Sequence, residues 1–323
     1  MPVDTLEFEE PVAALLKEID HLGSQPSSPE RAGEIARLQA RARQVRQDIF
    51  ARLTPWQRVL VARHPQRPYL LDYVERLWPG FTEIHGDRRF GDDQAIVTGF
   101  ATYHDQPVLI VGHQKGRDTK QKIARNFGYA RPEGYRKALR AMQMAEKFKR
   151  PVICLVDTPA AYPGMESEER GIAEAIALNL REMAVLDTPI LVVVTGEGGS
   201  GGALGIAVGD TVLMQEYAVY SVIPPEGCAA ILWRDPAKKV EAADALKMTA
   251  PDLVSREIVD GVIPEPAGGA HHDYDLAARQ LDAVLWPALQ QLMAMPATDR
   301  LERRYEKFRR IGRLGVEISG ATS

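Results

Sequence analysis

The chain has 323 residues and a formal net charge of −4, with 45% hydrophobic and 26% charged residues. This is the balance of an ordinary globular protein, and its near-neutral charge argues against extensive nucleic-acid binding. With two cysteines, Cys154 and Cys228, the chain cannot build a four-cysteine zinc site or a disulfide framework. No apolar run approaches the ~18 residues of a membrane span, and the acidic start predicts no signal peptide. We expect a cytoplasmic protein.

The first part of the chain is predicted to form a helical arm, residues 1–75. Residues 30–53 carry one narrow apolar stripe at helical spacing, made by Ile35, Leu38, Ala42, Val45, Ile49 and Leu53. Ser28 supplies an N-cap and Pro29 a first helical residue, and a second short helix is expected from Pro55 onward. Such helices have little core of their own, so we expect the arm to pack on another surface.

The main domain is predicted over residues 76–323. Strands are expected at 95–103, 107–112, 151–156, 189–194, 211–214 and 218–222, and helices at 132–149 and 167–186. The alternation of strands and helices predicts an α/β fold with a layered sheet. A last helix over 299–313 presents an apolar stripe on a basic rod. We expect it to be solvated, with the stripe docked on a partner, and nucleic-acid contact is the alternative.

The richest motif is the glycine run over residues 194–206, which follows a strand and opens a short helix. Glycines expose backbone N–H groups, and a helix N-terminus adds partial positive charge, so the run favours a phosphate or a transient oxyanion. Three other interpretations stay open. Gly196, Gly198 and Gly201 fit a dinucleotide fingerprint, with Glu216 as the ribose-binding acid. Ser200 fits a nucleophile elbow, followed by Asp260 and His271. Close packing of a strand-to-helix junction is the third.

A second loop, residues 157–164, leaves another buried strand just before a helix. Loops that leave the carboxyl ends of parallel strands form the ligand crevice of an α/β sheet, so both loops can supply N–H groups to one site. The alternative is that Pro159 and Pro163 only stiffen a connection. No cluster has metal-ligand spacing, and no lysine follows the glycine run as in a P-loop. An enolate reaction whose substrate brings its own base would suit such a chain.

Longer strings within the chain resemble the alpha subunit of bacterial acetyl-CoA carboxylase carboxyltransferase. The resemblance runs from about residue 30 to 310 and rests on these segments: His113-Gln114-Lys115-Gly116-Arg117-Asp118-Thr119, Arg131-Pro132-Glu133-Gly134-Tyr135-Arg136-Lys137-Ala138, 157–164, 196–205, 220–229 and Ile263-Pro264-Glu265-Pro266. Two positions depart from the family pattern. Ala160 stands where glycine is more common, which would be strained if φ is positive there, and Pro224 stands where serine is common but fits a turn.

The resemblance implies a crotonase-like fold of repeated ββα units, with the helical arm before it and helices after it. It implies transfer of a carboxyl group from carboxybiotin, carried on a separate carrier protein, to acetyl-CoA, giving malonyl-CoA for fatty acid synthesis. It also implies a zinc-ribbon beta subunit, a biotin carboxyl carrier protein and a biotin carboxylase as partners. An alpha2beta2 assembly with its site at the subunit boundary follows, with no metal on this chain.

The resemblance also implies site residues. The N–H groups of Gly201 and Gly202 are the expected oxyanion donors, with Gly198 and Gly199 shaping the turn. The Gly164 and Met165 amides are a second donor pair on the biotin side. Lys115 and Arg117, in a basic stretch, are expected to contact the phosphates of CoA, although a solvated face explains the stretch equally well. Two other functions stay open: a self-sufficient crotonase-type or serine hydrolase using Ser200, and a non-catalytic scaffold that holds a partner through the arm, residues 28–53, and the basic tail.

Overall fold

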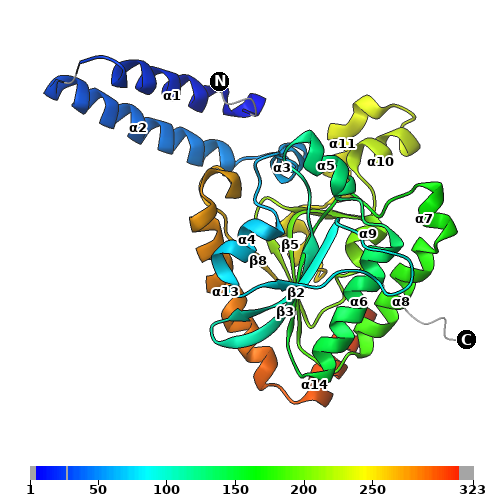
Figure 1. Ribbon diagram of the computed structural model, residues 1–323. Coiled ribbons are helices and arrows are strands. Elements are labelled where there is room, and N and C mark those ends of the chain that lie inside the picture. Colours follow the sequence, from blue (N-terminus) through cyan, green and yellow to red (C-terminus); the bar gives the residue numbers. More distant parts are fainter. Residues whose placement is uncertain (1–4, 27, 313–323) are drawn as a thin grey trace, which may run out of the picture.

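The computed structural model describes residues 5–26 and 28–312, and its body is a sheet covered by helices on both faces (Figure 1). The strands of this eight-stranded sheet are β1 (Thr82–Glu83), β2 (Ile96–Tyr103), β3 (Gln106–His113), β4 (Val152–Thr158), β5 (Ile190–Gly199), β6 (Thr211–Gln215), β7 (Val219–Ser221) and β8 (Gly261–Ile263). The longer helices are α1 (Glu10–Gly23), α2 (Pro29–Phe50), α3 (Pro55–Ala62), α4 (Leu70–Leu77), α6 (Pro132–Lys147), α8 (Ile172–Val185), α10 (Pro225–Leu232), α11 (Lys239–Leu246), α13 (Tyr274–Ala294) and α14 (Ala297–Arg310). Short helices α5 (Thr119–Ala124), α7 (Met165–Glu169), α9 (Ser200–Leu204) and α12 (Ala250–Ser255) lie between them. The α/β class predicted from the sequence is confirmed.

The sheet is antiparallel at one end and parallel over the rest, in the order β1-β2-β3-β4-β5-β6-β8, with β7 paired to β5. His104 and Asp105, which join β2 to β3, both have positive φ angles, of 45° and 61°. That conformation suits a two-residue hairpin turn, because its twist matches that of the strands. From β3 onward the pairs are parallel, so the carboxyl ends of β3, β4 and β5 lie along one edge.

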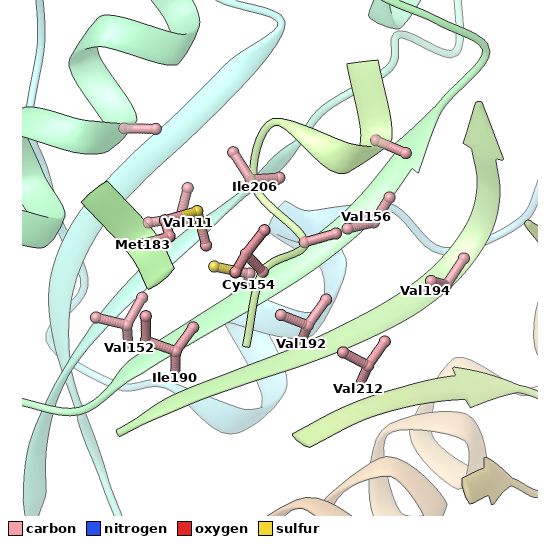
Figure 2. Close-up of a cluster of buried hydrophobic side chains, with 14 of the residues drawn as sticks. Val111, Val152, Cys154, Val156, Met183, Ile190, Val192, Val194, Ile206 and Val212 are labelled. Atoms are coloured by element: carbon pink, nitrogen blue, oxygen red, sulfur yellow. The ribbon is translucent and has the colours of Figure 1, made fainter. Parts of the chain in front are cut away.

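Alternate residues of each strand pack into two separate cores. On β4, Val152, Cys154 and Val156 face α6 and α8, as Figure 2 shows together with Met183 of α8. The intervening Ile153 and Leu155 face α4 and α13 on the other side of the sheet. This period of two is the strand geometry that buries both faces. Cys154 is a free thiol within the core.

The first two helices lie side by side and extend away from the body (Figure 1). The predicted N-cap of α2 is present, since Ser28 Oγ accepts from Arg31 N at 3.2 Å. Helix α3 begins at the predicted Pro55, with Thr54 as its N-cap. Helices α3 and α4 also belong to the predicted arm, yet they pack on the body through fully buried Val59 and Tyr73. Helix α1 lies within the predicted arm, although no individual helix was placed there.

Two expected elements differ from the structure for a backbone reason. The helix expected over 167–186 is two helices, because Gly171 adopts φ 77° and ends α7 before α8 begins. The strand expected to stop at residue 194 continues to Gly199. Residues without side chains let β5 pass close to the segment after β4, so the extended conformation persists through the first glycines of the run.

The last helix, α14, corrects the expectation of a solvated basic rod. Arg300 and Arg304 are buried, and Arg304 donates to both carboxylate oxygens of Asp210 at 2.8 Å. Arg304 also donates to the carbonyls of Met183, Leu186 and Thr188 at 2.7–2.9 Å. These carbonyls lie at and just beyond the end of α8, where a cation completes the helix terminus. Tyr305 of the same helix is 54% exposed.

Within residues 5–26 and 28–312, no helix is both long enough and apolar enough to cross a membrane.

Candidate functional site

The carboxyl ends of three adjacent strands meet in a charged network. Lys115, just after β3, places its Nζ 2.7 Å from Asp157 Oδ1 of β4 and 3.0 Å from Glu197 Oε2 of β5. Glu197 Oε1 also lies 2.6 Å from Nε of Arg63, which follows α3. Nη1 of Arg63 also lies 2.6 Å from Oε1 of Glu226 in α10. The network ties β3, β4, β5, α3 and α10 together at one edge of the sheet.

Burial and ion pairing shift the pKa values of these groups in opposite directions, and the effect of ion pairing is the larger one. Burial alone would lower the pKa of Lys115, but Asp157 and Glu197 hold that pKa above its usual range. Burial alone would raise the pKa of Glu197, but Lys115 and Arg63 hold it below its usual range. Both groups are therefore charged at neutral pH. This charged, hydrogen-bonded network fixes the strand ends that precede the two loops.

A second ion pair supports β5 from inside the body. Arg67 is fully buried, and its guanidinium donates to both carboxylate oxygens of Glu265 at 2.9 and 2.5 Å. Its Nε donates to the carbonyl of Thr195 at 2.6 Å. Glu265 also accepts from Tyr217 N and Ala270 N. Glu265 lies in the last string that carried the family resemblance, and this contact gives that string a structural role.

The glycines of the run differ in the space that an added Cβ would find. A Cβ on Gly199 would lie 1.7 Å from the carbonyl oxygen of Pro159, and one on Gly202 would lie 2.2 Å from Ala161 N. A Cβ on Gly198 would meet the Tyr220 ring at 2.6 Å. These three glycines thus serve the close packing that was one of the open interpretations. The exception is Gly201.

Gly201 faces open space, because its Cβ would meet only Ile176 Cδ1, at 3.9 Å. The chain turns from β5 into α9 at Ser200, whose φ is 52°. Among the described residues, none accepts a hydrogen bond from the Gly201 or Gly202 amide. Two amide donors therefore remain available beside a position without a side chain, a geometry that suits a negative oxygen.

The second loop lies against Gly199 and Gly202 of the first loop, and it also bonds to the segment before α6. Thr158 Oγ1 lies 2.7 Å from the Gly128 carbonyl, and Tyr162 N donates to the carbonyl of Ala130. Gly164 is the N-cap of α7, and the Met165 side chain next to it is 73% exposed. Neither amide of this pair donates to a described residue. The loop therefore brings a second helix start to the same edge of the sheet.

The two departures from the family pattern are accommodated. Ala160 is not among the described residues with positive φ, so alanine is unstrained there. Pro224 is the N-cap of α10, with φ −67°, where a missing N–H costs nothing.

The hydrolase interpretation is not supported, because its three residues lie apart. Ser200 follows the carboxyl end of β5, whereas Asp260 precedes β8 at the opposite edge and lies 2.8 Å from Lys307 Nζ. His271 stacks on His64, with ring centroids 3.8 Å apart. The dinucleotide interpretation is equally weak, since α9 has only five residues.

The two basic side chains expected to meet CoA are both engaged internally. The Lys115 side chain is 13% exposed and lies on Asp157 and Glu197. Arg117 places Nη2 2.7 Å from Asp72 Oδ2 and 3.0 Å from the Tyr274 hydroxyl, and its guanidinium covers the Tyr69 ring. Neither presents a free charge in this conformation.

Arg63 is the contributor that sequence reasoning missed. It lines a cavity of about 20 Å³ together with Pro159, Glu197, Gly198 and Ser221, room for about one water molecule. Arg63 comes from the predicted arm, and no local pattern distinguishes it from the many other arginines of that region. Asp157 and Glu197 did carry a signal: Asp157 directly follows an apolar run, and Glu197 comes three residues after one.

Comparison with known proteins identifies relatives over nearly the whole chain. A family model described as acetyl co-enzyme A carboxylase carboxyltransferase-like matches residues 5–312. The acetyl-coenzyme A carboxylase carboxyl transferase subunit alpha of Geobacter metallireducens is 55% identical over 309 residues, covering 95% of this chain and 97% of the relative. The same subunit of a Geobacillus strain is 53% identical over 312 residues, covering 96% of each chain.

Solved structures share the fold at low identity. Transcarboxylase 12S is 23% identical with a TM-score of 0.54, covering 68% of this chain, which spans 42% of the transcarboxylase chain. A chain of a Pseudomonas malonate decarboxylase hetero-tetramer is 17% identical with a TM-score of 0.57, covering 72% of this chain and 91% of that one. The crotonase-like fold is thereby confirmed.

Proposed function

The chain belongs to the family of acetyl-CoA carboxylase carboxyltransferase alpha subunits, and on that premise we propose how its two loops serve the reaction. The enzyme transfers a carboxyl group to acetyl-CoA and forms malonyl-CoA. When bound, the carboxylated biotin of a separate carrier protein supplies that carboxyl group. The methyl carbon of acetyl-CoA must lose a proton before it can accept the carboxyl, which places negative charge on the thioester oxygen.

The amides of Gly201 and Gly202 carry the proposal. Their N–H groups have no acceptor among the described residues, and Gly201 leaves room for an atom to approach. Donors fixed beforehand stabilise a developing oxyanion, and one such donor is typically worth about 3–4 kcal/mol of transition-state stabilisation. Gly198 and Gly199 hold the strand close to its neighbours, so that these donors stay in place.

A second pair of donors fits the biotin side. The amides of Gly164 and Met165 open α7, and neither is used by a described residue. The urea oxygen of biotin is a neutral acceptor that becomes more negative when the ring loses its carboxyl group, and paired N–H groups suit that change. The charged network of Lys115, Asp157 and Glu197 would keep the starts of the two loops in fixed positions relative to each other.

We propose that the site is completed by other chains. As the alpha subunit of a multi-subunit carboxylase, this chain works with a beta subunit, and we assign the zinc ribbon to that partner. The carrier protein and the biotin carboxylase complete the proposed assembly, with two copies of each transferase subunit. We place the enzyme in the cytoplasm and assign no metal to this chain for catalysis.

The test is carboxyl transfer by the purified chain, with and without its beta subunit. We expect no transfer without the partner and malonyl-CoA formation with it. Gly201→Val should lower kcat of the assembled enzyme by several orders of magnitude, because the added side chain fills the approach to both amides. Gly33→Ala, at an exposed position of α2 with open space around it, is the matched control and should leave kcat unchanged. Full activity of Gly201→Val would refute the proposed donors.

Contact between CoA and the basic stretch is tested separately. Arg117→Ala should raise KM for acetyl-CoA if Arg117 leaves Asp72 to meet a phosphate. An unchanged KM would restrict Arg117 to its contacts with Asp72 and Tyr274.

A further inference from the structure

Two neighbouring histidines and a distant glutamate meet where the arm joins the body. His272, in the short turn before α13, places Nε2 3.3 Å from Oε1 of Glu9, which is 263 residues away and immediately precedes α1. His271 lies beside His272, with ring centroids 4.5 Å apart. One ligand atom from each of the three residues lies within 4.8 Å of the others. We call Glu9, His271 and His272 the junction cluster.

His271 is the unusual member of the junction cluster. Both of its ring nitrogens are buried, and neither has a hydrogen-bond partner among the described residues. A neutral imidazole always keeps one nitrogen lone pair, which costs free energy when it is buried without a partner. A bound ion is one recognised reason for such an unsatisfied group.

We propose that the junction cluster is a site for a divalent transition-metal ion, such as Zn²⁺, that ties the start of the arm to the segment before α13. Two imidazoles and one carboxylate form a donor set that Zn²⁺ takes at about 2.0–2.2 Å, with the fourth position left to water. The three ligand atoms already lie within 4.8 Å of one another, so the proposal requires only side-chain rotation to bring them onto one ion. Imidazole donors also disfavour Ca²⁺ and Mg²⁺, which prefer oxygen.

Arg46 of α2 should limit the affinity of the junction cluster for a metal ion, and this expectation can be tested. A Cβ on Gly268 would lie 2.4 Å from His272 Cδ2 and 2.6 Å from Arg46 Cδ, so Arg46 borders the junction cluster. Its positive charge opposes a second cation and competes for Glu9. Removing that charge should therefore tighten metal binding, whereas it would do nothing for a site that binds no cation.

The experiment is titration of the full chain with Zn²⁺ by calorimetry, together with the absorption spectrum of bound Co²⁺. We expect one equivalent to bind. His272→Ala and Glu9→Gln should weaken binding at least about tenfold, a loss that even indirect ligand supports produce, and Arg46→Gln should strengthen it. His21→Ala, an exposed histidine of α1, is the matched control and should bind as the unchanged chain does.

A structural readout separates this site from adventitious binding. Zn²⁺ should slow hydrogen exchange of the amides around Glu9 in the unchanged chain and in His21→Ala, but not in His272→Ala. Absence of binding, equal binding by His272→Ala, or weaker binding by Arg46→Gln would each overturn the proposal.

Discussion

Replacing Arg304 by alanine should destabilise the protein far more than replacing its exposed neighbour Arg303. The guanidinium is 1% exposed and makes five hydrogen bonds, two to Asp210 and three to carbonyls at and beyond the end of α8. Alanine would leave the Asp210 carboxylate, itself 2% exposed, without its principal charge partner. It would also leave the carbonyls of Met183, Leu186 and Thr188 without that donor.

The magnitude follows from what is left unpaired. Removing one partner of a buried ion pair typically costs about 3–5 kcal/mol, because the remaining charge stays buried. Unfolding entropy of ~2.1 cal/mol/K per residue gives about 0.7 kcal/mol/K for 323 residues. A loss of about 4 kcal/mol should then lower Tm by about 6 °C.

The assay is thermal and urea unfolding of the full chain, with Arg303→Ala as the matched control. Arg303 is the exposed neighbour of Arg304, and its loss should change stability by less than about 0.5 kcal/mol. Combining Arg304→Met with Asp210→Asn should recover part of the loss, because no buried charge then remains unpaired. Equal Tm values for Arg304→Ala and Arg303→Ala would refute the reasoning.

Three further predictions concern backbone and titration. Gly202→Ala should lower the free energy of unfolding by about 2 kcal/mol or more, because its Cβ would lie 2.2 Å from Ala161 N. Gly201→Ala should leave the free energy of unfolding within about 0.5 kcal/mol of that of the unchanged chain. Urea unfolding midpoints of the two variants test this difference. Gly171→Ala should cost about 1–2 kcal/mol, because φ there is 77°, and Tm compared with that of Gly33→Ala checks this. Burial raises the pKa of Tyr220 to about 12, above the value of about 10 for an unfolded tyrosine. The contribution of Tyr220 to stability is thus complete below about pH 10 and is lost as pH rises towards 12, because the unfolded state gives up its proton first. Urea midpoints across that range should fall less steeply for Tyr220→Phe, and parallel curves would contradict the shift.

Local patterns were sufficient to predict most elements of the body and the strings that carry the family resemblance. The apolar run of β4 predicted a strand buried on both faces, because a strand without polar alternation has no face for water. The cap at Ser28 and the proline at residue 55 predicted where α2 and α3 begin, since capping involves only neighbours in sequence. The candidate donors, Gly201 and Gly202, were also named from sequence alone.

Only the tertiary structure decided which of these residues touch each other. It separated Gly201, which faces open space, from Gly199 and Gly202, which press on the second loop. It turned Arg304 inward to Asp210, although helical spacing placed it on an apparently solvated face. It also joined Glu9 to His272 across 263 residues. Spacing in sequence reports neighbours along one element, whereas burial and charge pairing depend on elements that meet only after the chain folds.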